Sequence, residues 1–184
     1  MMTFTAGQGL LGIGRGDITT WPVQAVVNAA NARLAGGGGV DGTIHRAAGP
    51  KLPEACREII RRLGILAAGD AVLTQGFDMQ AAHIIHTVGP IWRGGDAGEP
   101  EALAKAYRSC LELCRENAIE SVAFPAISCG VYGYPVEKAA PIALLELRRG
   151  LERNATAAAW MVLYSAAAYE TWLGFARRMF GSFS

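Results

Sequence analysis

The chain lacks the features that mark several large classes of protein. Its longest nearly uncharged apolar run, residues 155–169, has 15 residues, which is too short to span a membrane. The first charged side chain is Arg15, and because no basic start precedes an apolar segment we expect no secretory signal. The net charge is +1 and the charges are interspersed, so no basic surface for nucleic acid is indicated. We therefore expect a cytoplasmic protein with neither a membrane nor a nucleic-acid partner.

Cysteine and histidine are too few and too scattered to indicate a metal site. The cysteines are Cys56, Cys110, Cys114 and Cys129, without paired C-x-x-C spacing. In a chain without an export signal they are expected to be reduced thiols, and Cys110 and Cys114 share the apolar stripe of one helix, where they act as small hydrophobes. His83 and His86 lie three residues apart on a predicted strand and point to opposite faces. We predict no metal and no other cofactor.

The order of the predicted elements indicates one α/β domain. A chain of 184 residues is long enough for one well-buried domain and short for two, so we expect a single domain over residues 1–184. Apolar runs predict strands at residues 10–14, 23–28, 69–75, 82–88, 121–127 and 157–164, and one-sided apolar spacing predicts helices at 40–48, 53–63, 100–117 and 169–180. A further helix follows Pro135, with a kink or a late start caused by Pro141. This alternation predicts a mostly parallel sheet covered on both faces, with ligand loops at the carboxyl ends of the strands.

Four consecutive glycines, Gly36 to Gly39, cannot contribute to a core. Without Cβ atoms they let a ligand approach the backbone N–H groups directly, and the helix that follows adds the positive end of its dipole, so the segment suits an anion. The alternative is a flexible turn before a helix capped by Asp41. Asn28, Asn31 and Asp41 lie close to the glycines in sequence, and their polar side chains suggest hydroxyl recognition beside phosphate recognition. A sugar phosphate has both groups.

A second turn of the same kind follows the strand predicted at residues 121–127. Ser128 to Pro135 contains two glycines between a strand and a helix, which indicates a second phosphate cradle, with Tyr132 placed to cover the ligand. Asp17 lies near the end of the first predicted strand. It is either a ligand-binding residue or an ordinary turn or cap residue.

Taken together, these motifs resemble a macrodomain of the MacroD type. The segments that carry the resemblance are Gly16-Asp-Ile-Thr19, Asn28-Ala-Ala-Asn31, Gly36 to Pro50, Ile85-His-Thr-Val-Gly-Pro90 and Gly130-Val-Tyr-Gly-Tyr-Pro135. They occur in the family's order over nearly the whole chain. The resemblance implies a three-layer α/β/α fold with a mixed, mostly parallel sheet, which binds ADP-ribose in a crevice and hydrolyses ester-linked acyl groups from it. The Gly-Gly-Gly-Val-Asp-Gly segment separates this branch from macrodomains that only bind.

The resemblance also implies roles for individual residues. Asp17 would accept a hydrogen bond from the adenine amino group, with the Ile18 amide nearby. Asn31 and Asp41 would address the distal ribose, and His45 would support the loop that carries Asp41; these three are the catalytic candidates. The phosphates would be held by Gly37, Gly38, Gly39 and Val40 on one side and by Ser128, Cys129, Gly130, Val131 and Tyr132 on the other.

Two positions are not settled by the family pattern. Cys129 stands where threonine is usual, and a thiol beside a phosphate loop raises the alternative of a cysteine nucleophile, although no histidine is obviously paired with it. The aromatic residue that stacks on adenine is also open, and Tyr164, after the last strand, is the best candidate.

The leading functional hypothesis is a hydrolase of O-acetyl-ADP-ribose and of proteins mono-ADP-ribosylated at Asp or Glu. Both linkages are esters, so water attacks either the carbonyl carbon or the anomeric carbon, with Asp41 positioning the water or polarising a ribose hydroxyl. The alternatives are a module that reads ADP-ribose without turnover and a phosphatase for ADP-ribose 1″-phosphate. Asp41 argues against the reader, because a carboxylate beside two phosphates weakens binding through like-charge repulsion.

Overall fold

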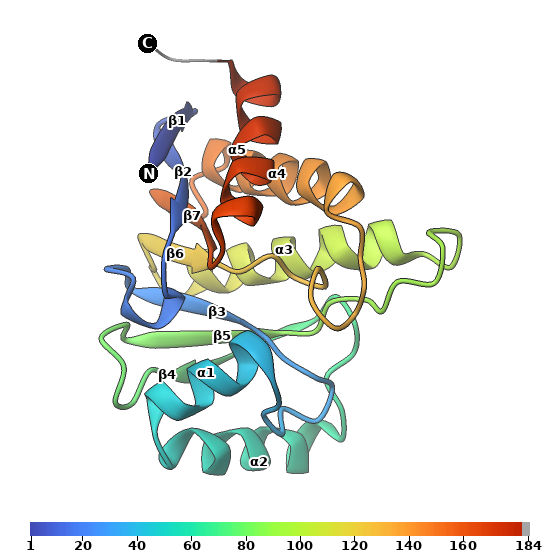
Figure 1. The fold of residues 1–184 in the computed structure, drawn as a ribbon. Coiled ribbons are helices and arrows are strands. Elements are labelled where there is room, and N and C mark those ends of the chain that lie inside the picture. Colours follow the sequence, from blue (N-terminus) through green and yellow to red (C-terminus); the bar gives the residue numbers. More distant parts are fainter. Residues whose placement is uncertain (182–184) are drawn as a thin grey trace.

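A seven-stranded sheet forms the centre of residues 1–181, the part of the chain that the computed structural model describes (Figure 1). The spatial order of the strands is β1-β2-β7-β6-β3-β5-β4. Their bounds are β1 Met2–Ala6, β2 Gly9–Arg15, β3 Ala25–Ala29, β4 Ala71–Gln75, β5 His83–Thr87, β6 Ser121–Phe124 and β7 Ala158–Leu163. The two outer pairs, β1 with β2 and β4 with β5, are antiparallel, and the inner pairs are parallel. The prediction of a mixed, mostly parallel sheet is confirmed.

Helices cover both faces of this sheet (Figure 1). One face carries α1 (Gly39–Ala48) and α2 (Lys51–Leu63), and the other carries α3 (Glu99–Glu116), α4 (Val136–Glu152) and α5 (Ala166–Phe180). The central strands supply apolar side chains to both faces: Val26 packs with the α1–α2 side, whereas Val27 packs with the α3–α5 side. A strand that is buried on both faces reads as a continuous apolar run, which is why the three layers were predictable.

The predicted helices and strands are all present, with ends that differ by a few residues. The sequence interpretation missed β1, whose alternating buried residues Phe4 and Ala6 were the available signal, and the short 3₁₀-helix η1 (Ile18–Thr20). Of the two expectations for Pro141, the late start is wrong, because α4 begins at Val136 and continues through the proline, and the kink stays a prediction. Buried alanines and leucines on both sides of Pro141 hold this helix against the sheet, and their packing outweighs one missing hydrogen bond.

The parallel strands β2, β3, β6 and β7 place their carboxyl ends along one edge of the sheet. The segments after these ends are the ones that the sequence singled out as ligand loops: Asp17 and Ile18 after β2, the glycine run after β3, Ser128 to Tyr132 after β6, and Tyr164 after β7. Segments that are far apart in sequence therefore meet at this edge.

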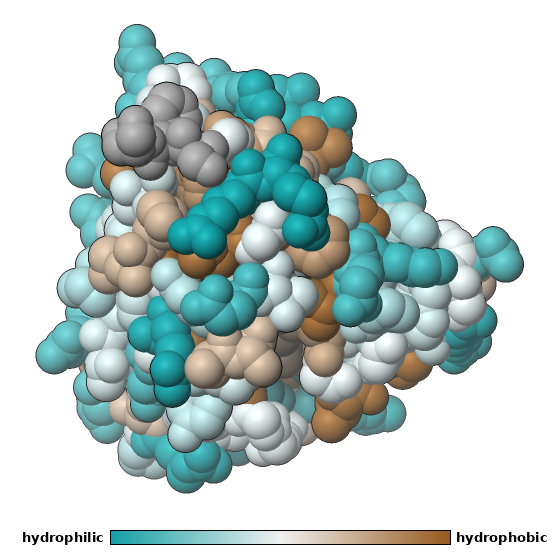
Figure 2. Space-filling model, turned by 45° about the horizontal axis from the view of Figure 1, so that its top comes forward, coloured by the Kyte–Doolittle hydropathy of each residue, from teal (hydrophilic) through white to brown (hydrophobic). Residues whose placement is uncertain are grey.

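Figure 2 shows one face of the molecule, on which hydrophilic residues predominate and hydrophobic residues are exposed in small separate areas. None of the helices within residues 1–181 combines the length and the hydrophobicity needed to cross a membrane.

Candidate functional site

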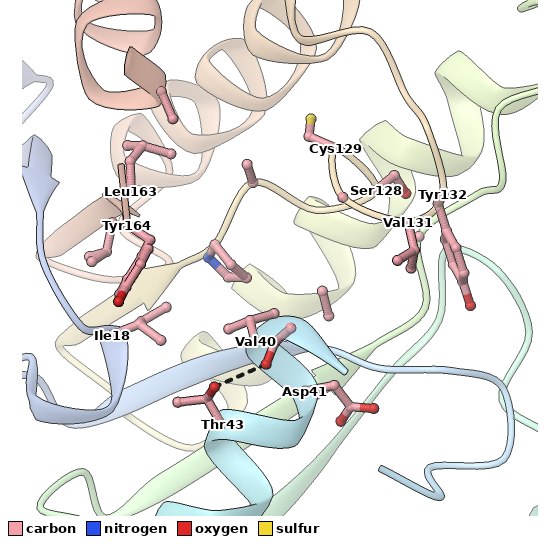
Figure 3. Close-up of a pocket in the computed structure, with 18 of the residues that line it drawn as sticks. Ile18, Val40, Asp41, Thr43, Ser128, Cys129, Val131, Tyr132, Leu163 and Tyr164 are labelled. Carbon is pink, nitrogen blue, oxygen red and sulfur yellow. Dashed lines mark hydrogen bonds between the residues drawn. The ribbon is translucent and has the colours of Figure 1, made fainter. Parts of the chain in front are cut away.

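A cleft of about 800 Å³ opens at the carboxyl ends of β2, β3, β6 and β7, a volume typical of small-molecule sites. It contains all the predicted site residues except His45, namely Asp17, Ile18, Asn31, Gly37, Gly38, Gly39, Val40, Asp41, Ser128, Cys129, Gly130, Val131, Tyr132 and Tyr164. Figure 3 shows Tyr164 and Ile18 toward one end of this cleft and Val131 and Tyr132 toward the other. The fold thus brings the predicted residues together, while their individual roles stay predictions.

The glycine run forms an open cradle at the start of α1. Gly38 is the N-cap residue and makes no side-chain cap, and Gly36 and Gly39 have φ angles of +75° and +60°, which favour glycine. The first-turn amides of Gly39, Val40 and Asp41 have no helical acceptor, and the described residues supply no other backbone acceptor for them. A Cβ at Gly38 or Gly39 would meet nothing within 4 Å. An anion can therefore approach these amides at the positive end of the helix dipole.

Asp41 is the third residue of α1, and the alternative that it caps the helix is wrong because Gly38 occupies that position with an extended backbone. The residue is only 6% exposed. Oδ1 accepts a hydrogen bond of 2.8 Å from Nδ2 of Asn28. Oδ2 lies 3.4 Å from the point that a Cβ on Gly37 would occupy, and no donor within residues 1–181 reaches it. One carboxylate oxygen is thus anchored and the other is available beside the cradle.

His45 lies one helical turn beyond Asp41, outside the lining of the cleft. Its Nε2 is 3.4 Å from Asp41 Oδ1 but makes no hydrogen bond within the described residues. A Cβ on Gly36 would lie 3.4 Å from Nδ1 of the same ring. His45 therefore packs between α1 and the glycine loop, a position that suits the predicted supporting role.

The two asparagines of the Asn-Ala-Ala-Asn motif have different surroundings. Asn31 organises its own loop: Nδ2 donates to the Gly36 carbonyl at 2.8 Å, and Oδ1 accepts from the amides of Arg33 and Ala35. One Nδ2 hydrogen stays available for a ligand in the cleft. Asn28, which the sequence grouped with it for hydroxyl recognition, is fully buried on β3 and does not line the cleft. That part of the prediction is wrong, because Asn28 points under Asp41.

The loop after β6 forms the second cradle. Ser128 has a φ of +66°, and the turn is closed by bonds from the Tyr134 amide to the Ser128 carbonyl at 3.0 Å and from the Gly133 amide to the Gly130 carbonyl at 2.9 Å. The amides of Gly130, Val131 and Tyr132 donate no backbone hydrogen bond within residues 1–181. A second set of unpaired donors therefore lines the same cleft.

The thiol of Cys129 is not poised for nucleophilic attack. Burial, with a smaller contribution from the Glu137 carboxylate, raises the pKa of Cys129 to about 12, and the thiol lies 3.6 Å from the Ile127 carbonyl that accepts from it. Because the thiolate is the nucleophilic form, this environment argues against the cysteine-nucleophile alternative.

Asp17 and Tyr164 lie in the part of the cleft formed after β2 and β7. Asp17 is the N-cap of η1, and its Oδ1 accepts from the amide and the hydroxyl of Thr19 at 2.9 and 2.7 Å. The turn-cap interpretation is therefore correct, and it leaves Oδ2 for a ligand. Tyr164 is 86% exposed and lies near Ile18 in Figure 3.

Sequence reasoning missed several lining residues. They are mainly apolar or small residues next to the strand ends: Ala29, Ala30, Pro125, Ala126, Val162, Leu163 and Ser165. Ala29, Ala30 and Ser165 lie within two residues beyond the ends of the predicted strands, and the other four lie inside the predicted strands near their carboxyl ends, so the carboxyl ends of the strands were the available signal. No group of three or more candidate metal ligands gathers within the described part of the chain, residues 1–181.

Comparison with known proteins gives consistent matches. The family profile described as "Macro domain" matches residues 27–143. A protein of Cronobacter sakazakii named O-acetyl-ADP-ribose deacetylase is 54% identical over 146 residues, which cover 79% of this chain and 81% of the relative. A protein of Salmonella gallinarum with the same name is 57% identical over 130 residues, 71% of this chain and 73% of the relative. A variant of the Oceanobacillus iheyensis macrodomain solved with ADPR has a TM-score of 0.94 and 40% identity, covering 98% of this chain and 99% of that chain.

Proposed function

Because the chain belongs to the Macro domain family, we propose that it binds ADP-ribose and hydrolyses O-acetyl-ADP-ribose to ADP-ribose and acetate. Relatives that are 54–57% identical carry the name of this activity, and a macrodomain of closely similar structure binds ADPR. The observation that carries the proposal for this chain is the combination, in one cleft, of two sets of unpaired amides with the half-anchored carboxylate of Asp41.

The two cradles divide the ligand between them. The amides at the start of α1 and those of the loop after β6 bind the two phosphates. The adenine lies toward Tyr164, where Asp17 Oδ2 accepts from its amino group and the aromatic ring stacks on the base. The distal ribose then lies beside Asn31 and Asp41.

Hydrolysis requires that water reach the ester while the ribose is held. In the carbonyl route, water adds to the ester carbon, the bond to the ribose oxygen breaks, that oxygen takes a proton, and acetate leaves. Asp41 Oδ2 positions the water or polarises a neighbouring ribose hydroxyl. Binding of the two phosphates holds the distal ribose in place, so that the ester stays aligned with the water. The anomeric route breaks the bond from the sugar carbon to the acyl oxygen instead.

The same chemistry extends to proteins that carry ADP-ribose on Asp or Glu, because their linkage is also an ester. Two features support this wider substrate range. Val131, which Figure 3 shows toward the end of the cleft where Asp41 lies, is fully exposed, and Tyr132 beside it is half-buried, so we expect this end to accommodate a larger acyl group.

Incubation with O-acetyl-ADP-ribose and, separately, with ADP-ribose 1″-phosphate tests the assignment. We expect acetate from the first and no phosphate from the second. Tight binding without release of acetate would identify a reader, and release of phosphate would identify a phosphatase. For the accepted substrate, oxygen-18 water labels acetate if the carbonyl is attacked and ADP-ribose if the anomeric carbon is attacked.

A further inference from the structure

A buried chain of hydrogen bonds continues from Asp41 across three neighbouring strands. Asn28 Nδ2 on β3 donates to Asp41 Oδ1 at 2.8 Å and lies 3.1 Å from His86 Nδ1 on β5. His86 Nε2 lies 3.0 Å from Thr74 Oγ1 on β4. Asn28 and His86 are register partners and are fully buried. The three side chains belong to the face of the sheet that α1 and α2 cover, so they lie directly beneath the helix that carries Asp41.

The chain has one consistent arrangement of protons. Nδ2 of Asn28 has two hydrogens; one bonds to Asp41 Oδ1, so the other points to His86 Nδ1, which must accept. The imidazole proton is then on Nε2, where it bonds to the Thr74 hydroxyl. The opposite orientation of the amide would set Asn28 Oδ1 against the carboxylate oxygen of Asp41, acceptor against acceptor.

The surroundings of His86 keep this arrangement in place. Burial, followed by the charge of the nearby His45, lowers the pKa of His86 to about 3, so the ring is neutral at neutral pH and Nδ1 retains its lone pair. The ring centroids of His45 and His86 are 6.4 Å apart. Asp41 and His45 are the ionisable groups of α1 beside the chain, and Cys56 of α2 is close enough to feel the charge of Asp41.

We propose that His86 is a positioning residue for hydrolysis, which through Asn28 holds Asp41 Oδ1 in place so that Oδ2 faces the cleft at a fixed angle. This role rests on the proposed function, because it requires that Asp41 act on the water or on the ribose hydroxyl. His86 itself touches no substrate, since it is fully buried under the sheet face. Its loss should therefore lower kcat more than it weakens the binding of ADP-ribose.

Three variants separate positioning from packing. His86→Leu removes the acceptor for Asn28, whereas His86→Asn places an amide oxygen near the position of Nδ1 and retains it. We expect kcat on O-acetyl-ADP-ribose to fall about 10–100-fold in His86→Leu, as for outer-shell partners of metal ligands, and His86→Asn to recover most of that loss.

Asn28→Ala should cause a loss of kcat like that of His86→Leu. The double variant, Asn28→Ala with His86→Leu, should lose little more, because both changes break the same hydrogen bond between Asn28 and His86. His83→Leu, on the opposite face of β5, is the matched control and should keep the parent kcat.

The decisive readouts do not depend on folding alone. Nitrogen NMR of the parent at neutral pH should show a neutral His86 with its proton on Nε2, and ADP-ribose affinity should stay close to the parent value in each folded variant. Three results would overturn the proposal. They are losses of kcat that add in the double variant, a rise in KM as large as the fall in kcat, and an imidazole proton on Nδ1 of His86. If His86→Leu does not fold, the His86→Asn and Asn28→Ala kinetics and the NMR result decide it. A parent protein that releases no acetate refutes the proposed function instead, and the tautomer still reports on the hydrogen-bond chain.

Discussion

The carbonyl oxygen of Gly37 lies against Cα of Gly42, so closely that a Cβ at position 42 would be 2.2 Å from it. This approach joins the glycine loop to the first turn of α1 and holds the loop beside the amides of the first cradle. Position 42 therefore requires glycine because of a close contact between backbones, since its φ is not in the left-handed region.

Gly42→Ala should weaken ADP-ribose binding while the fold is retained. The added methyl group must push the Gly37 carbonyl away and shift the cradle. We expect a loss of affinity of about tenfold, or about 1.4 kcal/mol, measured by calorimetry. Gly174→Ala in α5 is the control, because its Cβ would meet only an arginine side chain at 3.5 Å. Parent affinity in Gly42→Ala would show that the loop does not carry the phosphate site.

Gly38→Glu should abolish detectable ADP-ribose binding. The position has free space around it, with nothing within 4 Å of a Cβ, so the side chain can be accommodated without unfolding the protein. It would fill the approach to the amides and bring a negative charge to a diphosphate. Gly38→Gln has nearly the same bulk without the charge, and it should bind more tightly than Gly38→Glu, with the difference shrinking as salt is raised. Equal affinities of Gly38→Glu and Gly38→Gln for ADP-ribose would show that position 38 does not lie beside the diphosphate.

Asp17→Asn separates the cap from adenine recognition. The amide oxygen can still accept from Thr19 and preserve η1, but an NH₂ group replaces the free carboxylate oxygen and faces the adenine amino group, donor against donor. We expect a loss of about 1.5–3 kcal/mol in ADP-ribose binding. The variant should also prefer hypoxanthine, whose carbonyl oxygen accepts from NH₂. Competition between ADP-ribose and its inosine analogue measures this, and an unchanged preference for adenine would place the base elsewhere.

The sequence was sufficient where local pattern decides structure. The apolar runs at Val26-Val27 and Ile84-Ile85 predicted central strands, and the glycine run before a helix predicted an open loop with exposed amides, because each signal lies within a few neighbouring residues. Asn28 shows where such reasoning ends. Its role depends on which residue of β5 lies opposite it, and that register is set by the whole sheet. The short edge strand β1 was missed for a different reason, because its only local signal is the alternation of two buried residues, Phe4 and Ala6, over five positions.

The stability of the protein should fall in acid partly because of His86. The pKa of His86 is lowered from 6.5 to about 3 in the folded protein. Between pH 3 and pH 6.5 the unfolded chain therefore binds a proton at this residue that the folded chain does not bind. The contribution is therefore complete above pH 6.5 and is lost as the pH falls, at up to about 1.4 kcal/mol per pH unit. Urea unfolding of the parent and of His86→Asn from neutral to acid pH should show a shallower decline in the variant. His83→Asn retains His86 and should keep this part of the slope. Parallel declines in the parent and in His86→Asn would mean that His86 accepts a proton in the fold.

Asp41→Asn tests the centre of the proposed mechanism, because the structure removes the main competing explanation of its effect. Gly38 is the N-cap, so a loss of activity in this variant cannot be assigned to a lost cap, and the Asn side chain retains an oxygen that can accept from Asn28. The fold should therefore survive, as thermal unfolding will show, and ADP-ribose should bind at least as well, because a negative charge beside the diphosphate has been removed. If Asp41 Oδ2 positions water or accepts a proton, turnover of O-acetyl-ADP-ribose should nevertheless fall by roughly 10²–10⁴, the usual span for a lost acid–base group. Asn31→Ala should lower turnover by misplacing the distal ribose, and its effect should combine non-additively with that of Asp41→Asn, because both act on the same reacting atoms. Release of acetate by Asp41→Asn at the parent rate would exclude this carboxylate from the chemistry, and the search for the group that activates water would then move to the backbone and the phosphates of the ligand itself.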